Sequence, residues 1–310
     1  MVKLYALVAE AVTKRFGRVV ALNNFSLRVE EGEVLCLLGP NGAGKTTFLN
    51  IVSTVLRPTS GSVRVFGRDV VREGRVVRSM VGYAFQEPRL FWRFSPREVL
   101  TFHAKVYRVR DLGVVDEVLK ALDLRSVRDR SVEYLSGGQR KKVEVGKVFV
   151  QRPRLALLDE PTAMIDLEGK HVVWDMIRAL RDEGSTVIVA TNEIYEAEYL
   201  ATKVVIMDRG EVVAEGDPEG LKERLGGGDV IDVYLEGARA GVVEAIRVVE
   251  GVIGIDVVGD RVSVRVRRYE DVLPEIVEVL KRCGVRARSI RVAEPTLDDI
   301  FLRATRGAGR

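Results

Sequence analysis

The sequence contains very little cysteine: Cys36 and Cys283 are the two cysteines in 310 residues. Cys36 falls in an apolar run, Cys283 follows a helix-like stretch, and the two are not spaced as metal ligands. We therefore expect neither a disulfide framework nor a cysteine-based metal site, and we expect a reducing compartment.

Long apolar runs are also missing, since no stretch approaches the roughly 20 residues that a membrane-spanning helix needs. The first residues do not have the form of a signal peptide. Lysine and arginine are not gathered into one block and the net charge is only +4, so nucleic acid is not an expected partner. With 46% hydrophobic residues, we expect a folded chain that is soluble or membrane-peripheral.

One segment matches the phosphate-binding pattern G-x-x-x-x-G-K-[ST] without a mismatch. It consists of Gly39, Pro40, Asn41, Gly42, Ala43, Gly44, Lys45, Thr46 and Thr47. The apolar run 34–38 before it suits a buried strand, and apolar residues recur at helical spacing after it. In this context backbone N–H groups can surround phosphate oxygens. We expect Lys45 to reach the β- and γ-phosphates and Thr46 to bind Mg²⁺.

A second buried strand, predicted over 155–158, ends in the adjacent carboxylates Asp159 and Glu160. Asp159 is the expected Mg²⁺ partner, and Glu160, pointing the other way, can polarise an attacking water as general base. Gln86 ends another short strand, predicted over 81–85, and can contact the metal or a water; on its own it would be a surface amide.

The segment Leu135-Ser136-Gly137-Gly138-Gln139 predicts a helix start, because Ser136 and Gln139 form a capping box. Capping does not account for two consecutive glycines, which are costly inside a helix. They leave N–H groups open to an anion, so this is a second potential phosphate site.

Two aromatic features have alternative interpretations. Phe16 is either a core residue or a platform on which a nucleotide base stacks. The segment Leu90-Phe91-Trp92-Arg93-Phe94 is either core or a surface on which another protein docks.

Strand and helix patterns predict an α/β fold with two domains. Residues 1–225 contain a first strand over 4–12, the phosphate loop and a helical region over about 87–151. A linker is predicted at Gly226-Gly227-Gly228. Residues 229–310 follow the order βαββαβ, which is typical of a small ferredoxin-like module.

Together, the Gly39–Thr47 loop, the Leu135–Gln139 segment and the run Leu155–Pro161 make residues 1–225 similar to the ATP-binding subunit of an ABC transporter. The resemblance implies a P-loop NTPase that hydrolyses ATP with Mg²⁺ in a head-to-tail dimer, most simply a homodimer. Ser136, Gly137, Gly138 and Gln139 would then bind the ATP held by the second subunit. Phe16 takes the adenine-stacking position, Gln86 the Q-loop position and Asp166 the D-loop position. The Asn-Lys-x-Asp signature of GTPases is absent, which also favours ATP.

Residues 229–310, with Pro295–Leu302 near their end, resemble the appended domain of the drug- and polysaccharide-export (ABC-2) branch. In that branch the region from Gln86 to Phe94 packs against a membrane permease, which favours docking. The resemblance implies a peripheral subunit at the cytoplasmic face of the cell membrane.

One residue departs from the family pattern: Asn192 stands where the family usually has histidine. Asparagine offers only neutral hydrogen-bonding groups at the γ-phosphate, whereas histidine can carry a proton. We therefore expect slow but real hydrolysis, with Asn192 as a weaker member of the catalytic set.

Two other functions are weighed against transport. A soluble ABC ATPase acting on DNA or ribosomes would carry a long coiled-coil insert or two ATPase domains, and this sequence has neither. A regulatory module that binds ATP without hydrolysing it is favoured by Asn192 and opposed by Glu160.

Overall fold

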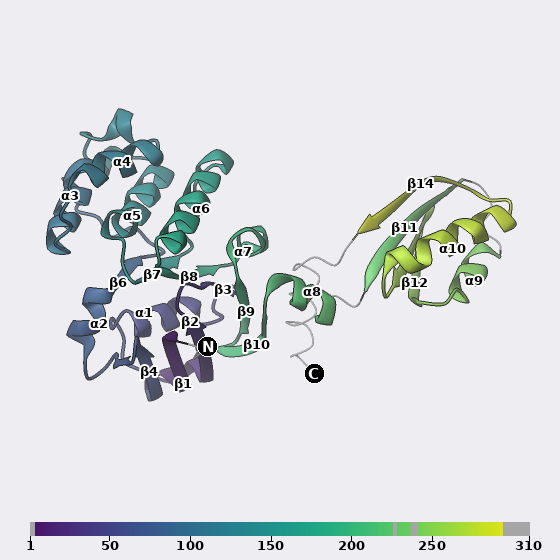
Figure 1. Cartoon of the computed structure of the whole chain (residues 1–310), viewed down its shortest axis with the longest axis horizontal. Helices are drawn as coiled ribbons and strands as arrows, with labels where there is room; N and C mark the ends of the chain where they lie inside the picture. Colours follow the sequence, from purple (N-terminus) through teal and green to yellow (C-terminus); the bar gives the residue numbers. More distant parts are fainter. Residues whose placement is uncertain (1–3, 226–227, 237–240, 294–310) are drawn as a thin grey trace. The chain divides into compact units, whose positions relative to one another are not determined.

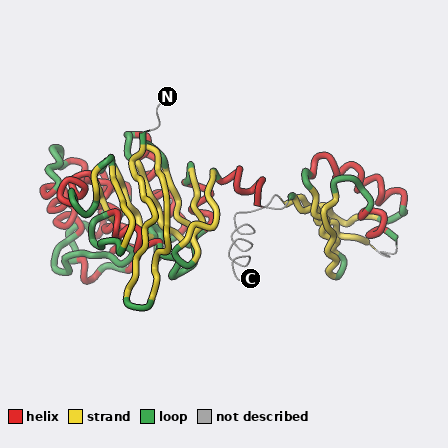
Figure 2. The backbone as a smooth tube through the Cα atoms, turned by 90° about the horizontal axis from the view of Figure 1, so that it is seen from below, coloured by secondary structure: helices red, strands yellow, loops and turns green. Residues whose placement is uncertain are grey.

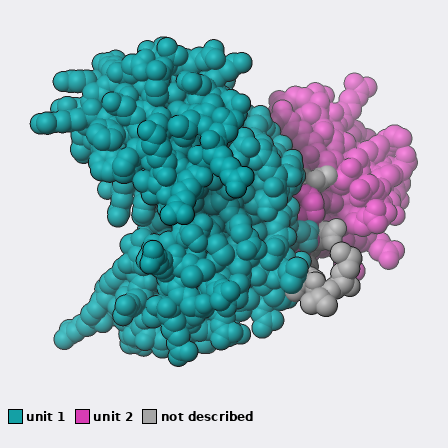
Figure 3. Space-filling model, turned by 60° about the vertical axis from the view of Figure 1, so that its left-hand side comes forward, with its two compact units in different colours: residues 1–218 teal, residues 219–310 magenta. Residues whose placement is uncertain are grey.

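The computed structural model describes residues 4–225, 228–236 and 241–293. The chain divides into two compact units, Met1–Pro218 and Glu219–Arg310 (Figure 3). This division lies slightly before the boundary at residue 225 that the glycine run suggests. Of that run, Gly226 and Gly227 lie outside the described residues, as does the segment 295–302. Among the described residues, no helix combines the length and apolarity needed to cross a membrane.

The first unit is organised around a six-stranded sheet with the order β10-β9-β3-β8-β7-β6. Its strands are β3 (Val34–Leu38), β6 (Val81–Ala84), β7 (Leu155–Asp159), β8 (Thr186–Thr191), β9 (Lys203–Asp208) and β10 (Glu211–Gly216). All neighbours are parallel except β9 and β10, which form a hairpin. Every residue of β3, β7 and β8 is buried, which explains their continuous apolar sequences.

A second, antiparallel sheet has the order β2-β1-β4-β5. It consists of β1 (Tyr5–Phe16), β2 (Val19–Glu30), β4 (Ser60–Val65) and β5 (Arg68–Asp69). Helix α1 (Lys45–Val52) packs with both sheets in one apolar core, where Phe48 contacts Phe25 with ring centroids 4.7 Å apart. Figure 2 shows the strands of this unit at its centre with helices beside them.

Strand β1 is longer than predicted. The expected strand ended at Val12, whereas β1 continues to Phe16. The pairing with β2 shifts register between Ala9 and Val12, and Ala11 has a φ of 50°. This bulge interrupts the two-residue alternation on which the sequence prediction relied.

The other helices of this unit are α2 (Gly74–Met80), α3 (Pro96–Val106), α4 (Gly113–Ala121), α5 (Gly137–Gln151), α6 (Leu167–Asp182) and α7 (Ile194–Leu200), with short 3₁₀ turns at Arg125–Val127 and Val132–Tyr134. They either contact the strands, as α2, α6 and α7 do, or pack mainly on one another, as α3, α4 and α5 do. Figure 1 shows α3, α4 and α5 together, away from β1, β2 and β4. These three helices fall within residues 87–151, where the sequence predicts a helical region, and Ser95 with Glu98 caps α3 as its sequence indicates.

The second unit has its own core. After α8 (Pro218–Leu225) come β11 (Asp229–Glu236), α9 (Val242–Arg247), β12 (Val252–Val258), β13 (Arg261–Val266), α10 (Tyr269–Arg282) and β14 (Arg286–Ala293). The sheet order β12-β13-β11-β14 is antiparallel throughout, so the predicted βαββαβ arrangement is confirmed. Its core is rich in valine and isoleucine from the strands and from α9 and α10.

Candidate functional site

The phosphate loop joins β3 to α1, as its sequence predicts. The buried ammonium group of Lys45 donates to the carbonyl oxygens of Gly39, at 2.6 Å, and Pro40, at 3.1 Å. Burial lowers the pKa of Lys45, while the carboxylates of Glu160 and Asp159 act in the opposite direction. Gly44 has a φ of 102° at the start of α1, and a Cβ there would lie 2.5 Å from the carbonyl oxygen of Ala21. Glycine is therefore required by both backbone angle and space.

Asp159 ends β7 next to this loop. Its Oδ1 atom is buried and has no hydrogen-bond partner among the described residues. Tyr83 donates weakly to Oδ2, at 3.4 Å. Burial raises the pKa of Asp159, and the Thr46 hydroxyl and the Lys141 ammonium group partly offset this shift. An unpartnered carboxylate oxygen close to a hydroxyl group is the donor set that a hard cation prefers, so these residues fit Mg²⁺.

Glu160 adopts an unusual backbone conformation, with a φ of 45°. Its amide donates to the carbonyl oxygen of Ala190 at 2.8 Å, which ties the end of β7 to the end of β8. A left-handed conformation is costly for a glutamate and is common where function dictates the direction of a side chain. The sequence showed the carboxylate but not this strain.

Three other predicted residues lie on exposed surface. The side chains of Gln86 and Asn192 are exposed, at the ends of β6 and β8. Phe16 is 47% exposed at the end of β1, with Lys14 Nζ 4.9 Å from its ring centroid. The interpretation of Phe16 as a core residue is therefore wrong, and a free ring face suits stacking.

Ser136 caps α5 as predicted, in a complete capping box with Gln139. The structure adds a packing reason for the second glycine. A Cβ on Gly138 would lie 2.6 Å from the carbonyl oxygen of Met164, whereas one on Gly137 would meet the Met164 sulfur at 3.1 Å. Two residues further on, Asp166 caps α6 by accepting from the Gly169 amide. The Leu135–Gln139 and Asp166 motifs are thus brought together, and the interpretation that only an anion site explains both glycines is corrected.

The aromatic patch, defined as Phe91, Trp92, Phe94 and Phe102, lies on the surface. Phe91 and Trp92 are 53% and 58% exposed, so the core alternative for this segment is wrong. The three phenylalanine rings contact one another, with Phe91 and Phe94 centroids 5.1 Å apart and Phe102 edge-on to both, whereas the Trp92 ring lies 5.6 Å from the guanidinium group of Arg140. Exposed, mutually packed aromatics are typical of a protein-binding surface.

Several buried charged residues escaped the sequence analysis. Lys141 and Glu144 lie on the buried face of α5, and burial lowers the pKa of Lys141 to about 8. Among their partners, Phe85 and Arg89 are more than fifty residues away, which sequence periodicity cannot show. The available signal was that charges occupy the face of a helix that is otherwise apolar.

Glu196 of α7 is another such residue. Its Oε1 atom accepts from the Thr162 hydroxyl and the Trp174 indole, each at 2.9 Å, while Oε2 is buried without a partner in the described part of the chain. Burial raises the pKa of Glu196. This residue joins the segment after Glu160 to the helix after Asn192.

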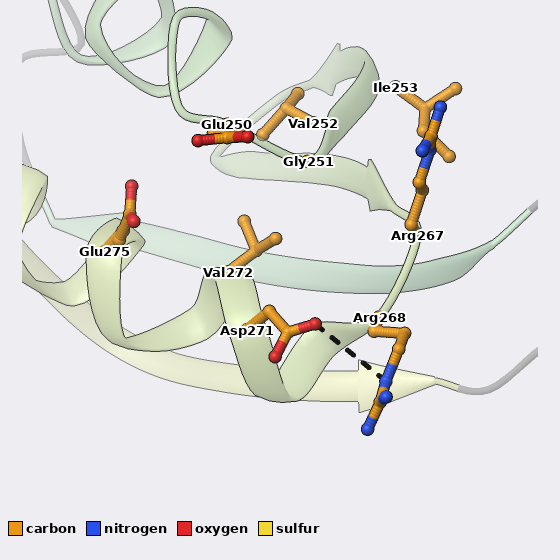
Figure 4. A pocket seen from close by; sticks show the side chains of 9 residues that line it. All are labelled: Glu250, Gly251, Val252, Ile253, Arg267, Arg268, Asp271, Val272 and Glu275. Atoms are coloured by element: carbon orange, nitrogen blue, oxygen red, sulfur yellow. Dashed lines mark ion pairs between the residues drawn. The ribbon is translucent and has the colours of Figure 1, made fainter.

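The second unit contains a cavity of about 650 Å³, between the α9–β12 turn and the start of α10 (Figure 4). Glu250 lies beside Val252 and Glu275 lies beside Val272, with both carboxylates toward the same end of the cavity, and Arg268 pairs with Asp271. None of the predicted site residues lines this cavity.

The family comparisons agree with the two units. Residues 22–163 match the family described as ABC transporter, and residues 216–305 match the C-terminal domain described as ATP-binding protein DrrA1-3-like. Daunorubicin resistance ATP-binding protein DrrA2 of Streptomyces coeruleorubidus is 37% identical over 306 residues, 97% of this chain and 95% of the relative. The chain is an ATP-binding protein of the ABC transporter family.

Other relatives of this ABC ATP-binding protein align along nearly its whole length. Nod factor export ATP-binding protein I of Rhizobium etli is 31% identical over 95% of this chain and 91% of its own. Among solved structures, the dimeric ATP-binding cassette MJ0796 in a post-hydrolysis state with ADP and Pi is 26% identical, with a TM-score of 0.63 over 68% of this chain and 98% of its own. The P-loop fold and ATPase activity that the resemblance implies are thereby confirmed.

Proposed function

We propose that this ABC ATP-binding protein powers export through a separate membrane permease, as one of two subunits in a head-to-tail dimer. The observation that supports the proposal is that the first unit carries two separate elements suited to binding phosphate. The Lys45 loop and Asp159 would form one half of a nucleotide site, and the exposed N-terminus of α5 at Ser136 would form the other. Figure 1 supports this, since α5 belongs to the helical group and α1 lies among the strands.

In the half of the site that contains the Lys45 loop, each residue has a separate task. Phe16 stacks on the adenine, and Lys45 with the loop amides binds the β- and γ-phosphates. Glu160 orients and deprotonates the attacking water as general base. Asn192 and Gln86, exposed at neighbouring strand ends, hydrogen-bond to the γ-phosphate and the water. Across the dimer, Ser136 and the amides of 137–139 bind the γ-phosphate, and Asp166 supports that contact from the adjoining loop.

Thr46 and Asp159 would hold Mg²⁺, with Gln86 as a further ligand. The Oδ1 atom of Asp159, which has no hydrogen-bond partner in the described part of the chain, supports this assignment. When bound, the ion neutralises charge on the phosphates in the transition state. Burial raises the pKa of Asp159, and the ammonium groups of Lys141 and Lys45 act in the opposite direction, in favour of the ionised carboxylate.

The permease would dock on the aromatic patch, near Gln86. This placement implies a peripheral subunit at the cytoplasmic face of the membrane. Transport is supported over other ABC ATPase functions by the relatives, which are named for daunorubicin resistance, linearmycin resistance and Nod factor export. These relatives are named for different compounds, although their ATP-binding chains are similar in sequence, so we assign the choice of cargo to the permease.

The test has two measurements. Light scattering gives the size of the Glu160→Gln protein with and without Mg-ATP, and an ATPase assay gives the turnover of the wild type and of Glu160→Gln. We expect a dimer only with Mg-ATP, because the ATP-bound form cannot proceed to hydrolysis. Turnover should fall by about 10²–10⁴. Full activity in the variant would remove Glu160 as the base. A monomer in both conditions would contradict the homodimer.

A further inference from the structure

The backbone of residues 85–89 is held by two buried charged side chains of α5. Lys141 is fully buried, and its ammonium group donates to the carbonyl oxygens of Phe85, at 2.9 Å, Gln86, at 3.0 Å, and Asp159, at 2.8 Å. An ammonium group has three N–H donors, and here each has one carbonyl acceptor. The helix that begins at Ser136 is thereby joined to the ends of β6 and β7.

Glu144, one turn further along α5, binds the same loop through its amides. Its carboxylate accepts from the Phe85 amide at 3.1 Å and the Arg89 amide at 2.9 Å. The ion pair with Lys147, at 2.8 Å, balances its charge, and the Glu144 side chain is fully buried. Lys141 therefore holds carbonyl groups and Glu144 holds amides of one short loop, while the Gln86 side chain stays exposed.

The same loop continues into the aromatic patch, which is also hydrogen-bonded to the segment that precedes α5. The carbonyl oxygen of Trp92 accepts from the Ser131 hydroxyl at 2.7 Å and from the Glu133 amide at 3.1 Å. The carbonyl oxygen of Phe94 accepts from the Val132 amide at 2.8 Å. The patch is thus hydrogen-bonded to the segment just before Ser136, and the loop before the patch is hydrogen-bonded to the helix just after it.

We propose that Lys141 and Glu144 form a backbone clamp that positions Gln86 and makes the aromatic patch, the Gln86 loop and the N-terminus of α5 move as one body. The clamp thereby couples nucleotide binding to the surface on which a permease docks. This inference rests on the proposed function. Lys141 and Glu144 are positioning residues, because their side chains bind the backbone of residues 85–89 and, for Lys141, also the carbonyl oxygen of Asp159.

Buried ions are costly to desolvate, and well-packed apolar residues often serve as well or better. Apolar side chains cannot replace a clamp on peptide groups, because the partly buried carbonyls and amides of the loop would lose these hydrogen-bond partners. Coupling through such a network has to be tested at both of the places it joins, which here are the nucleotide site and the aromatic patch.

The first readout is steady-state ATPase activity of the full chain. We expect Lys141→Met to lower kcat by about 10², as small displacements of catalytic groups do, with KM for ATP little changed because the Lys45 loop is intact. Lys141→Arg keeps N–H donors and should restore part of the turnover. The matched control is Lys120→Met, the same substitution at an exposed lysine of α4, which should behave as wild type.

The second readout is acrylamide quenching of tryptophan fluorescence. The chain has two tryptophans, and the quencher reports on Trp92 because Trp174 is buried. Mg-ATP should change the quenching constant in wild type and in Lys120→Met, and leave it unchanged in Lys141→Met. The clamp is overturned if Lys141→Met has an unaltered kcat, or if quenching of Trp92 in this variant still changes with Mg-ATP.

If Lys141→Met does not fold, Glu144→Gln replaces it. That variant keeps one acceptor oxygen for the loop amides and loses the other. Both kcat and the response of Trp92 to Mg-ATP should therefore fall, but by less than the fall expected for Lys141→Met. A folded Glu144→Gln protein with wild-type values overturns the clamp. The proposed function fails separately, by the absence of ATP hydrolysis in wild type.

Discussion

A Cβ atom on Gly138 would lie 2.6 Å from the carbonyl oxygen of Met164. The start of α5 and the loop before α6 therefore touch backbone to backbone. Gly138→Ala must push two main-chain segments apart, which should cost about 1–3 kcal/mol of unfolding free energy. Gly137→Ala should cost less, because its Cβ would meet only the flexible Met164 sulfur. Urea unfolding of the two variants measures the difference, and equal losses would contradict this packing.

The pH dependence of stability should carry a signature of His103. Burial lowers its pKa to about 4, and its Nε2 lies 3.1 Å from Gln151 Oε1. Because Gln151 Nε2 donates to the Val81 carbonyl oxygen, Oε1 is the acceptor and His103 Nε2 is the donor.

The unfolded histidine has its ordinary pKa of about 6.5, so the unfolded state binds more protons below that pH. The free energy of unfolding should therefore fall as pH drops from about 6.5 to 4, by up to about 3 kcal/mol for a shift of this size. Urea unfolding across that range would show the slope, and His103→Gln should remove it. A wild-type slope retained in His103→Gln would assign it to other groups.

The exposed ring of Phe16 should set the affinity for ATP. Base stacking is worth about 1–3 kcal/mol, so Phe16→Ala should raise KM for ATP by about 5- to 100-fold with little change in kcat. Phe16→Trp should retain a low KM. Val19→Ala, at an exposed apolar residue of the same hairpin, is the control and should leave KM unchanged. An unaltered KM in Phe16→Ala would remove the stacking role.

Asn192 should limit turnover. Asn192→His introduces a group that can hold a proton at the γ-phosphate, so kcat should rise and acquire a step between about pH 5 and 8 that wild type lacks. The measurement is a pH–kcat profile of both proteins at saturating Mg-ATP. If the profiles coincide, the residue at this position does not limit the reaction.

Local patterns accounted for much of the fold and the site. The phosphate loop, both capping boxes and the βαββαβ order follow from residues close in sequence, so they could be predicted. The extension of β1 to Phe16 could not, because a bulge at Ala11 breaks the alternation. The exposure of Phe16 depends on which sheet face is covered, and this is a property of the assembled unit.

Long-range partners are the other part that the sequence did not reveal. Lys141 and Glu144 look like surface charges of a helix until Phe85 and Arg89 are brought beside them. Likewise, Gly138 looks like an open anion site until the Met164 carbonyl group is placed against it. In each case the deciding contact joins segments whose separation along the chain carries no periodic signal.

The parallel sheet places its functional loops after β3, β6, β7 and β8, at the carboxyl ends of the strands. The turns that lead into these strands lie at the opposite edge and carry none of the proposed site residues. Between α6 and β8, the exposed Glu183 and Gly184 form such a turn, with Gly184 at a φ of 99°. An affinity tag or a fluorescent reporter could be inserted there with little disturbance of the chemistry, since exposed turns tolerate added chain. The edge of the sheet opposite the proposed site is therefore the place where the chain can be modified without altering the site.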